Sequence, residues 1–257
     1  MTGIRMRVAE QYVDVDFDLA VSMGLIDGFS HIHKFGLNTA VGSAFETVWS
    51  MNAAYVYLAA ATVLNVSSGD VDDTAAGAGA QQIVVQGLDG NCNEISEYVE
   101  LNGQTAVATK KAYFRVHRMM VTRGASNQGI VYIGTGGPAS GVPTTTYGAI
   151  PLGYGQTLQC FYTVPAGKTL YMYEFKASSG VSKNITVRIC VRPQGAAFQT
   201  KDVMQIVEGQ GVNNWKFPFK IPAGCDIEVQ ALAGAGGGSI EATFTGLVVN
   251  QHSSRQF

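Results

Sequence analysis

Charged residues are scarce in this chain of 257 residues. Lys, Arg, Asp and Glu together make up 14% of it, against about 25% in an average soluble domain. The formal net charge at pH 7 is −2, whereas a protein that binds nucleic acid by neutralising phosphates is basic. The composition therefore argues against a nucleic-acid partner and predicts an unusually neutral surface, of the kind that packs against neighbouring molecules.

The chain also lacks a long apolar run. The longest, residues 53–64, is interrupted by Thr62 and is too short to span a bilayer. The first residues contain neither the uninterrupted apolar core nor the cleavage site of a secretory signal. We therefore expect no membrane partner and folding in a reducing cytoplasm.

Motifs for metal, redox and nucleophilic chemistry are missing as well. The four cysteines contain no Cys-x-x-Cys pair and are expected to be reduced and buried: Cys92, Cys160, Cys190 and Cys225. No Gly-x-Ser-x-Gly motif occurs, and the glycines at 134–141 lack the Gly-Lys-Ser/Thr ending of a phosphate loop. His31 and His33 have the spacing of zinc ligands, but a solvated or interfacial pair is the favoured interpretation. We predict no catalytic residue, no cofactor and no metal site.

Glycine and strand-forming residues dominate what is present. The chain has 31 Gly, and 46% of its residues are hydrophobic, which supplies a core and excludes intrinsic disorder. Segments that alternate or favour strands recur between turn signals, at 83–88, 97–101, 112–121, 129–134, 157–163, 169–175, 184–192, 216–221, 226–231 and 240–249. Residues 89–93 predict a hairpin loop, and Pro-Ala-Gly at 165–167 and 222–224 predicts two turns. The fold class expected is all-β.

The pattern predicts two antiparallel β-sandwich domains, jelly-roll-like in the second, preceded by an N-terminal arm. Residues 1–45 have no settled period and form either an arm that docks on a neighbour or an irregular first turn. Residues 46–137 form the first sandwich. The boundary is placed in the Gly-, Pro- and Thr-rich segment 135–151, so that residues 138–257 form the second sandwich.

Aromatic residues supply the candidate interface. Eleven Tyr and twelve Phe lie mainly on the expected strands, where some must point outward because a sheet has two faces. Outward aromatic groups with few charges are typical of interfaces and favour a homo-oligomer. The candidate interface residues are His31, His33, Phe35, Trp49, Tyr171, Tyr173 and Trp215. Trp215, next to Asn213 and Asn214, either binds a glycan or covers the edge of the core.

Several short strings resemble a family of tailed-phage virion proteins that is common in phages of aquatic bacteria and cyanobacteria. They occur in order between residues 31 and 250 and include His33-Lys-Phe-Gly-Leu-Asn38, Thr47-Val-Trp49, Asp72-Asp-Thr-Ala-Ala-Gly-Ala-Gly79, Gly87-Leu-Asp-Gly-Asn91, Asn93-Glu-Ile-Ser-Glu97, Leu101-Asn-Gly103, Phe114-Arg-Val116, Val164-Pro-Ala-Gly-Lys-Thr169 and Val191-Arg-Pro193. The chain departs from the family at residues 50–55, where an apolar segment replaces a Gly/Asn-rich stretch.

This resemblance implies a non-enzymatic virion structural protein that is assembled in the cytoplasm of a host bacterium. The function expected first is that of a capsid cement or decoration protein, which binds the major capsid protein on the outer shell and stabilises it. A trimer would match the local threefold axes of a shell. The alternative is a neck, tail or head-fibre component that contacts the portal or a glycan on the host surface. A hydrolytic enzyme is the third class considered.

Overall fold

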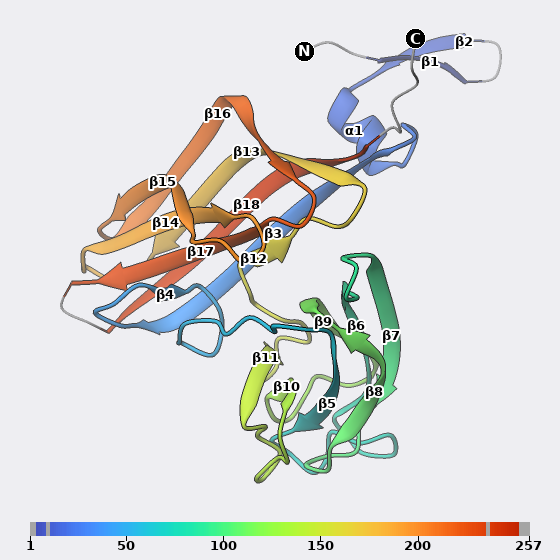
Figure 1. Ribbon diagram of the computed structural model, residues 1–257, viewed down its shortest axis with the longest axis vertical. Coiled ribbons are helices and arrows are strands. Elements are labelled where there is room, and N and C mark those ends of the chain that lie inside the picture. The colour runs from blue at the N-terminus through green and yellow to red at the C-terminus, as the bar shows by residue number, and fades with distance from the viewer. Residues whose placement is uncertain (1–3, 9–10, 235–236, 252–257) are drawn as a thin grey trace.

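The computed structural model describes residues 4–8, 11–234 and 237–251 and shows an all-β protein. The described residues form antiparallel sheets and one short helix (Figure 1). The elements up to the first long strand are β1 (Ile4–Val8), β2 (Gln11–Val15), α1 (Phe17–Ser22) and β3 (Phe29–Val41). Asp16 begins the helix, because its Oδ1 accepts hydrogen bonds from the backbone N–H groups of Asp18 and Leu19. Among the described residues no helix is long and apolar enough to cross a membrane.

The larger unit has two facing sheets that enclose one core. One sheet has the strand order β16-β13-β18-β3 and the other β12-β17-β14-β15, with the two-residue β4 (Glu46–Thr47) beside β17. The strands are β12 (Phe161–Thr163), β13 (Lys168–Ser179), β14 (Ile185–Arg192), β15 (Gln199–Ile206), β16 (Gly209–Pro222), β17 (Asp226–Ala233) and β18 (Gly238–Asn250). Phe175, Phe244 and Ile189 are fully buried between the sheets.

A second unit is inserted between β4 and β12. Its sheets have the orders β11-β10-β5-β8 and β7-β6-β9, and they share a separate core around Tyr113 and Met119. The strands are β5 (Thr62–Ser68), β6 (Ala80–Leu88), β7 (Glu94–Glu100), β8 (Val107–Tyr113), β9 (Arg115–Gly124), β10 (Val131–Thr135) and β11 (Thr145–Ile150). In Figure 1 this inserted unit lies beside the larger unit, below it in the view.

These pairings correct the expected segment limits. β3 pairs along its length with β18, so residues 29–41 belong to the larger unit and not to an N-terminal arm. The expected boundary at 137/138 falls inside a sheet, because β10 pairs with β11 on the other side of it. The chain passes between the units instead at residues 48–61 and 151–160. Residues 1–3 and 9–10 of the expected arm lie outside the described residues.

The expected turns are found where the sequence placed them. β6 and β7 form a hairpin whose loop is residues 89–93, with Leu88 opposite Glu94. Asp89 Oδ1 accepts hydrogen bonds from the backbone N–H groups of Asn91 and Asn93, which closes the loop. Gly167 and Gly224 have φ of +68° and +76° in the turns before β13 and β17, a conformation that glycine adopts without steric cost.

The two crossings between the units, residues 48–61 and 151–160, pack closely against β3 at Gly36. A Cβ at Gly36 would lie 2.3 Å from the carbonyl oxygen of Val48 and 2.6 Å from the backbone nitrogen of Cys160. Val48 and Cys160 belong to the outgoing and returning crossings, and the Cys160 N–H donates to the Val48 carbonyl over 3.0 Å. Glycine is required here because both backbones approach β3 within contact distance of a side chain.

Candidate functional site

A buried ion-pair network joins the two units. Asp226, at the start of β17, has a side chain that is 1% exposed, and its carboxylate lies between two arginines. Arg115 of the inserted unit donates from Nε over 3.0 Å and from a terminal nitrogen over 3.2 Å, and Arg192 of β14 donates from Nε over 3.0 Å. Thr163 adds a hydrogen bond of 2.6 Å. The network therefore fixes β9 of the inserted unit against β14 and β17.

The junction extends to a second buried carboxylate. Glu228 accepts hydrogen bonds from Tyr57 Oη over 2.8 Å and from Thr47 Oγ1 over 2.6 Å. Burial raises the pKa of Glu228 above its ordinary value, and these hydrogen bonds act in the opposite direction. Both guanidinium groups also lie over the Tyr57 ring, with Cζ of Arg115 4.9 Å and Cζ of Arg192 4.3 Å from the ring centroid. The two units are thus joined by paired charges and an aromatic ring.

Sequence reasoning assigned no site to the residues of this network, although Arg115 and Arg192 occur in the strings that carry the family resemblance. Arg115 and Arg192 lie in the strands predicted at 112–121 and 184–192, and Asp226 is the first residue of the strand predicted at 226–231. A buried charge needs a partner, but Arg115 and Asp226 are 111 positions apart, and Glu228 and Thr47 are 181 positions apart. One signal was available, because the chain has few charges and several of them adjoin aromatic residues.

The structure places three of the predicted interface residues on one part of β3. His31 and His33 are exposed, Phe35 is half-buried, and the rings of His33 and Phe35 lie 5.8 Å apart. Arg118 of β9 approaches them, with its Cζ 5.6 Å from the centroid of Phe35. The strand therefore brings these three residues together on one face of β3, the face opposite to that of Lys34.

Trp49 is a core residue, which corrects its assignment to an interface. Its relative exposure is 3%, and its indole N–H donates to the carbonyl of Ala53 over 2.7 Å. The ring packs edge-to-face against Tyr55 and Phe161, with centroids 5.2 and 6.1 Å away. Trp49 thus fills the core of the inserted unit where the chain enters it.

The remaining predicted residues lie on the larger unit. Tyr171 and Tyr173 are half-buried positions of β13. Trp215 is half-buried on β16 and packs against the edge of the larger core. Its indole N–H donates to Asp202 Oδ2 over 2.9 Å, and its ring lies edge-to-face on Phe219. The polar edge of this tryptophan is therefore used within the protein.

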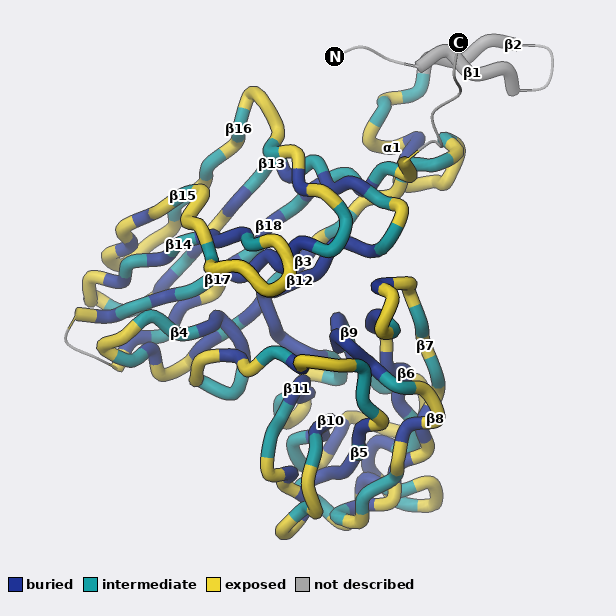
Figure 2. The backbone as a smooth tube through the Cα atoms, in the orientation of Figure 1, coloured by how far each residue is buried: buried dark blue, intermediate teal, exposed yellow. Residues whose placement is uncertain are grey.

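Exposed apolar residues that sequence reasoning missed occur along β15, β16 and their connection. The register between β13 and β16 shifts at Tyr173: Met172 pairs with Phe219, and Glu174 pairs with Asn214. Residues 215–218 of β16 therefore form a bulge opposite Tyr173. Phe217, in this bulge, is 80% exposed. Figure 2 shows exposed, yellow segments along β16. Val203 on β15, Val207 in the connection and Val212 on β16 are each more than 40% exposed. We call Phe217 and these three valines the β15–β16 apolar surface. Pro218 was the available signal, since proline within a strand marks an edge or a bulge.

Metal-ligating side chains and cysteine thiols are two further kinds of candidate group among the described residues. No group of three or more His, Cys, Asp or Glu side chains there is arranged to hold a metal ion. The four cysteines are free thiols and buried. Burial raises the pKa of each thiol, which keeps it protonated and unreactive at neutral pH.

Comparisons with known proteins give weak matches. No family model and no curated protein matches the chain. The structure of the infectious bursal disease virus Gx strain matches with 10% identity and a TM-score of 0.24, over 88% of this chain and 73% of that chain. The crystal structure of the VP2 subviral particle of infectious bursal disease virus matches with 10% identity and a TM-score of 0.22, over 90% and 74%. TM-scores this low support no argument about this protein.

Proposed function

We propose that the protein is a non-enzymatic structural component of a phage virion, and specifically a capsid cement or decoration protein. In this role it binds the major capsid protein on the outer shell and acts as a homo-oligomer, a trimer on the local threefold axes. It is assembled in the bacterial cytoplasm and uses neither a nucleic-acid nor a membrane partner. The family resemblance of the sequence motivates the proposal, and three structural features support it.

The observation that carries the proposal is the strand order of the larger unit. Numbered along the chain from β3, its eight main strands divide into sheets of order 6-3-8-1 and 2-7-4-5. This is the order of a jelly roll, a two-sheet architecture frequent in viral capsid and lectin domains. We infer that the larger unit is a jelly-roll sandwich and that the unit of β5–β11 is a second, smaller sandwich inserted into its first connection.

The junction and the apolar surface fit the same role. A cement protein transmits load between neighbouring subunits, and the network around Asp226 joins the two units of this protein through charges that are largely buried. The β15–β16 apolar surface presents aliphatic and aromatic groups to solvent, and contacts between proteins preferentially bury such groups. We propose that this surface contacts the shell.

The experiment that tests the function is quantitative mass spectrometry of purified particles, with this chain counted against the major shell protein. A ratio near one, or near one third, supports cement or decoration. A few copies per particle would instead support the neck, tail or head-fibre alternative. Absence of the chain from particles would refute the virion role.

A variant separates the contact surface from the fold. Phe217→Ser removes the most exposed aromatic group and is expected to lower incorporation into particles while the protein remains folded. Val71→Ser is the matched control, since Val71 is 64% exposed and belongs to the inserted unit. Normal incorporation of Phe217→Ser would refute the assignment of the shell contact to the β15–β16 apolar surface.

A further inference from the structure

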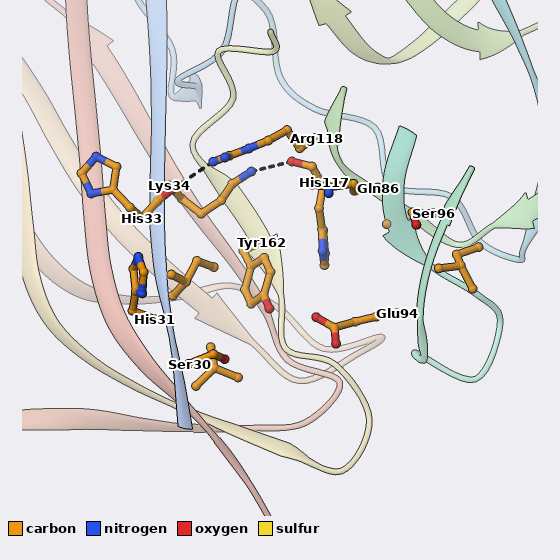
Figure 3. A pocket seen from close by; sticks show the side chains of 14 residues that line it. Ser30, His31, His33, Lys34, Gln86, Glu94, Ser96, His117, Arg118 and Tyr162 are labelled. Carbon is orange, nitrogen blue, oxygen red and sulfur yellow. Dashed lines mark hydrogen bonds between the residues drawn. The ribbon is translucent and has the colours of Figure 1, made fainter. Parts of the chain in front are cut away.

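A cleft of about 450 Å³ opens between the two units (Figure 3). One wall is β3 from Ser30 to Lys34, and the opposite wall comes from β6 and β7 and includes Gln86 and Ser96. Residues of β9 and β12 line it between these walls. The cleft is therefore built jointly by the larger and the inserted unit.

Two cations line this cleft without a carboxylate partner. Lys34 is 5% exposed, and its ammonium donates to the backbone carbonyl of His117 over 2.5 Å. Arg118 donates to the backbone carbonyl of His33 over 3.1 Å. Within the described residues neither cation forms an ion pair, whereas a buried lysine is rarely found without an anionic partner. Figure 3 shows both side chains extended across the gap between β3 and β9.

Burial disfavours the charged form of both cations, and the charge of Arg118 also disfavours that of Lys34. Burial, followed by the positive charge of Arg118, lowers the pKa of Lys34 to about 7. Burial likewise lowers the pKa of Arg118. Both effects oppose the charged form, and a bound anion would reverse both by supplying the missing opposite charge.

The neighbouring side chains do not provide this anion. His117 Nε2 accepts a hydrogen bond from the backbone N–H of Thr163 over 3.1 Å, so this nitrogen carries no proton and the ring is neutral. Burial, with the nearby charge of Lys34, lowers the pKa of His117 well below its ordinary value. Glu94, the carboxylate on the cleft wall, forms its ion pair with Lys168.

We propose that the cleft is a binding site for a small oxyanion ligand, whose carboxylate or phosphate group lies between the Lys34 ammonium and the Arg118 guanidinium. A guanidinium presents several N–H donors in a plane that matches such groups, and an ammonium adds a point charge. The exposed side chains of Ser30, Gln86 and Ser96 supply hydrogen-bonding groups for the remainder of the ligand. This site does not depend on the proposed virion role.

Calorimetric titration of the full-length protein tests the proposal, with inorganic phosphate in one arm and succinate in the other at constant ionic strength. At least one anion is expected to bind with a Kd below about 1 mM. The tighter of the two identifies whether the site prefers phosphate or carboxylate. Absence of binding by both anions up to about 10 mM would overturn the proposal.

Variants assign the binding to these two side chains. Lys34→Met and Arg118→Gln are each expected to weaken binding at least tenfold, while the control Lys220→Met leaves it unchanged. Lys220 is an exposed lysine of β16, so its removal changes the net charge equally at a distance from the cleft. Equal weakening by all three variants would show non-specific charge attraction and overturn the assignment.

A second measurement reports on Lys34 itself in the unmodified protein. The pKa of its ammonium, followed by NMR of the side chain, is expected to rise by at least one unit when the anion is added, which corresponds to about a tenfold change in proton affinity. A purely structural lysine would not respond, and an unchanged pKa in the presence of bound anion would overturn the proposal.

Discussion

The ion-pair network at the junction predicts a large cost for a small chemical change at Asp226. Asp226→Asn keeps the shape of the side chain but removes its charge. It leaves Arg115, which is 4% exposed, facing an amide instead of a carboxylate. The amide also places an N–H group where one guanidinium now donates, so one charged hydrogen bond becomes a contact between two donors.

The magnitude follows from the burial of the three groups. Removing one member of a buried ion pair costs about 3–5 kcal/mol, because the remaining charge has been withdrawn from water without a partner. Arg192 has a side chain 20% exposed and regains part of its hydration, so most of the cost comes from Arg115. We expect Asp226→Asn to lower the free energy of unfolding by about 3–5 kcal/mol.

Denaturant unfolding monitored by circular dichroism measures this change. Glu94→Gln is the matched control, since Glu94 is half exposed in its pair with Lys168, and exposed pairs contribute about 0–1 kcal/mol. Calorimetry of Asp226→Asn should also show the two units unfolding at more widely separated temperatures, because the network spans both. A loss below about 1 kcal/mol, equal to that of Glu94→Gln, would refute the reasoning.

Three other predictions concern close packing, pH and thiols. Gly36→Ala should destabilise the protein by about 1–3 kcal/mol, since its Cβ would overlap the backbones of Val48 and Cys160. The control Gly137→Ala has open space around its Cβ and should leave the free energy of unfolding unchanged. Denaturant unfolding compares the two variants. Because burial lowers the pKa of Lys34 from 10.5 to about 7, the unfolded chain binds more protons there between these values, so stability should rise with pH above 7. Lys34→Met should reduce this slope between about pH 7 and 8.5, and equal slopes would contradict the assignment. A thiol reagent should modify the four buried cysteines only after unfolding, and rapid labelling of the native protein would contradict their burial.

The sequence by itself determined the local structure of this protein. Alternating segments became strands such as β14, because one face of each strand had to be apolar to be buried. The turns at Gly167 and Gly224 and the loop at 89–93 were predictable, since positive φ and side-chain-to-backbone hydrogen bonds are properties of a few adjacent residues. The strands β3, β5 and β15 were not predicted. The strand β11 was also missed, because its residues Thr145–Ile150 follow a run of turn-forming residues and include Gly148.

Only the tertiary structure decided which strands belong together. β3 lies in the first 45 residues yet pairs with β18 near the end of the chain, and pairings over such distances depend on the shape of the whole core. The same holds for the chemistry at the junction. Arg115 and Asp226 are buried as an ion pair, and Lys34 and Arg118 line one cleft, because the inserted unit folds back against the larger one. The spacing of residues along a chain predicts turns and the faces of strands. Contacts between charges distant in sequence arise only when two cores have formed and packed.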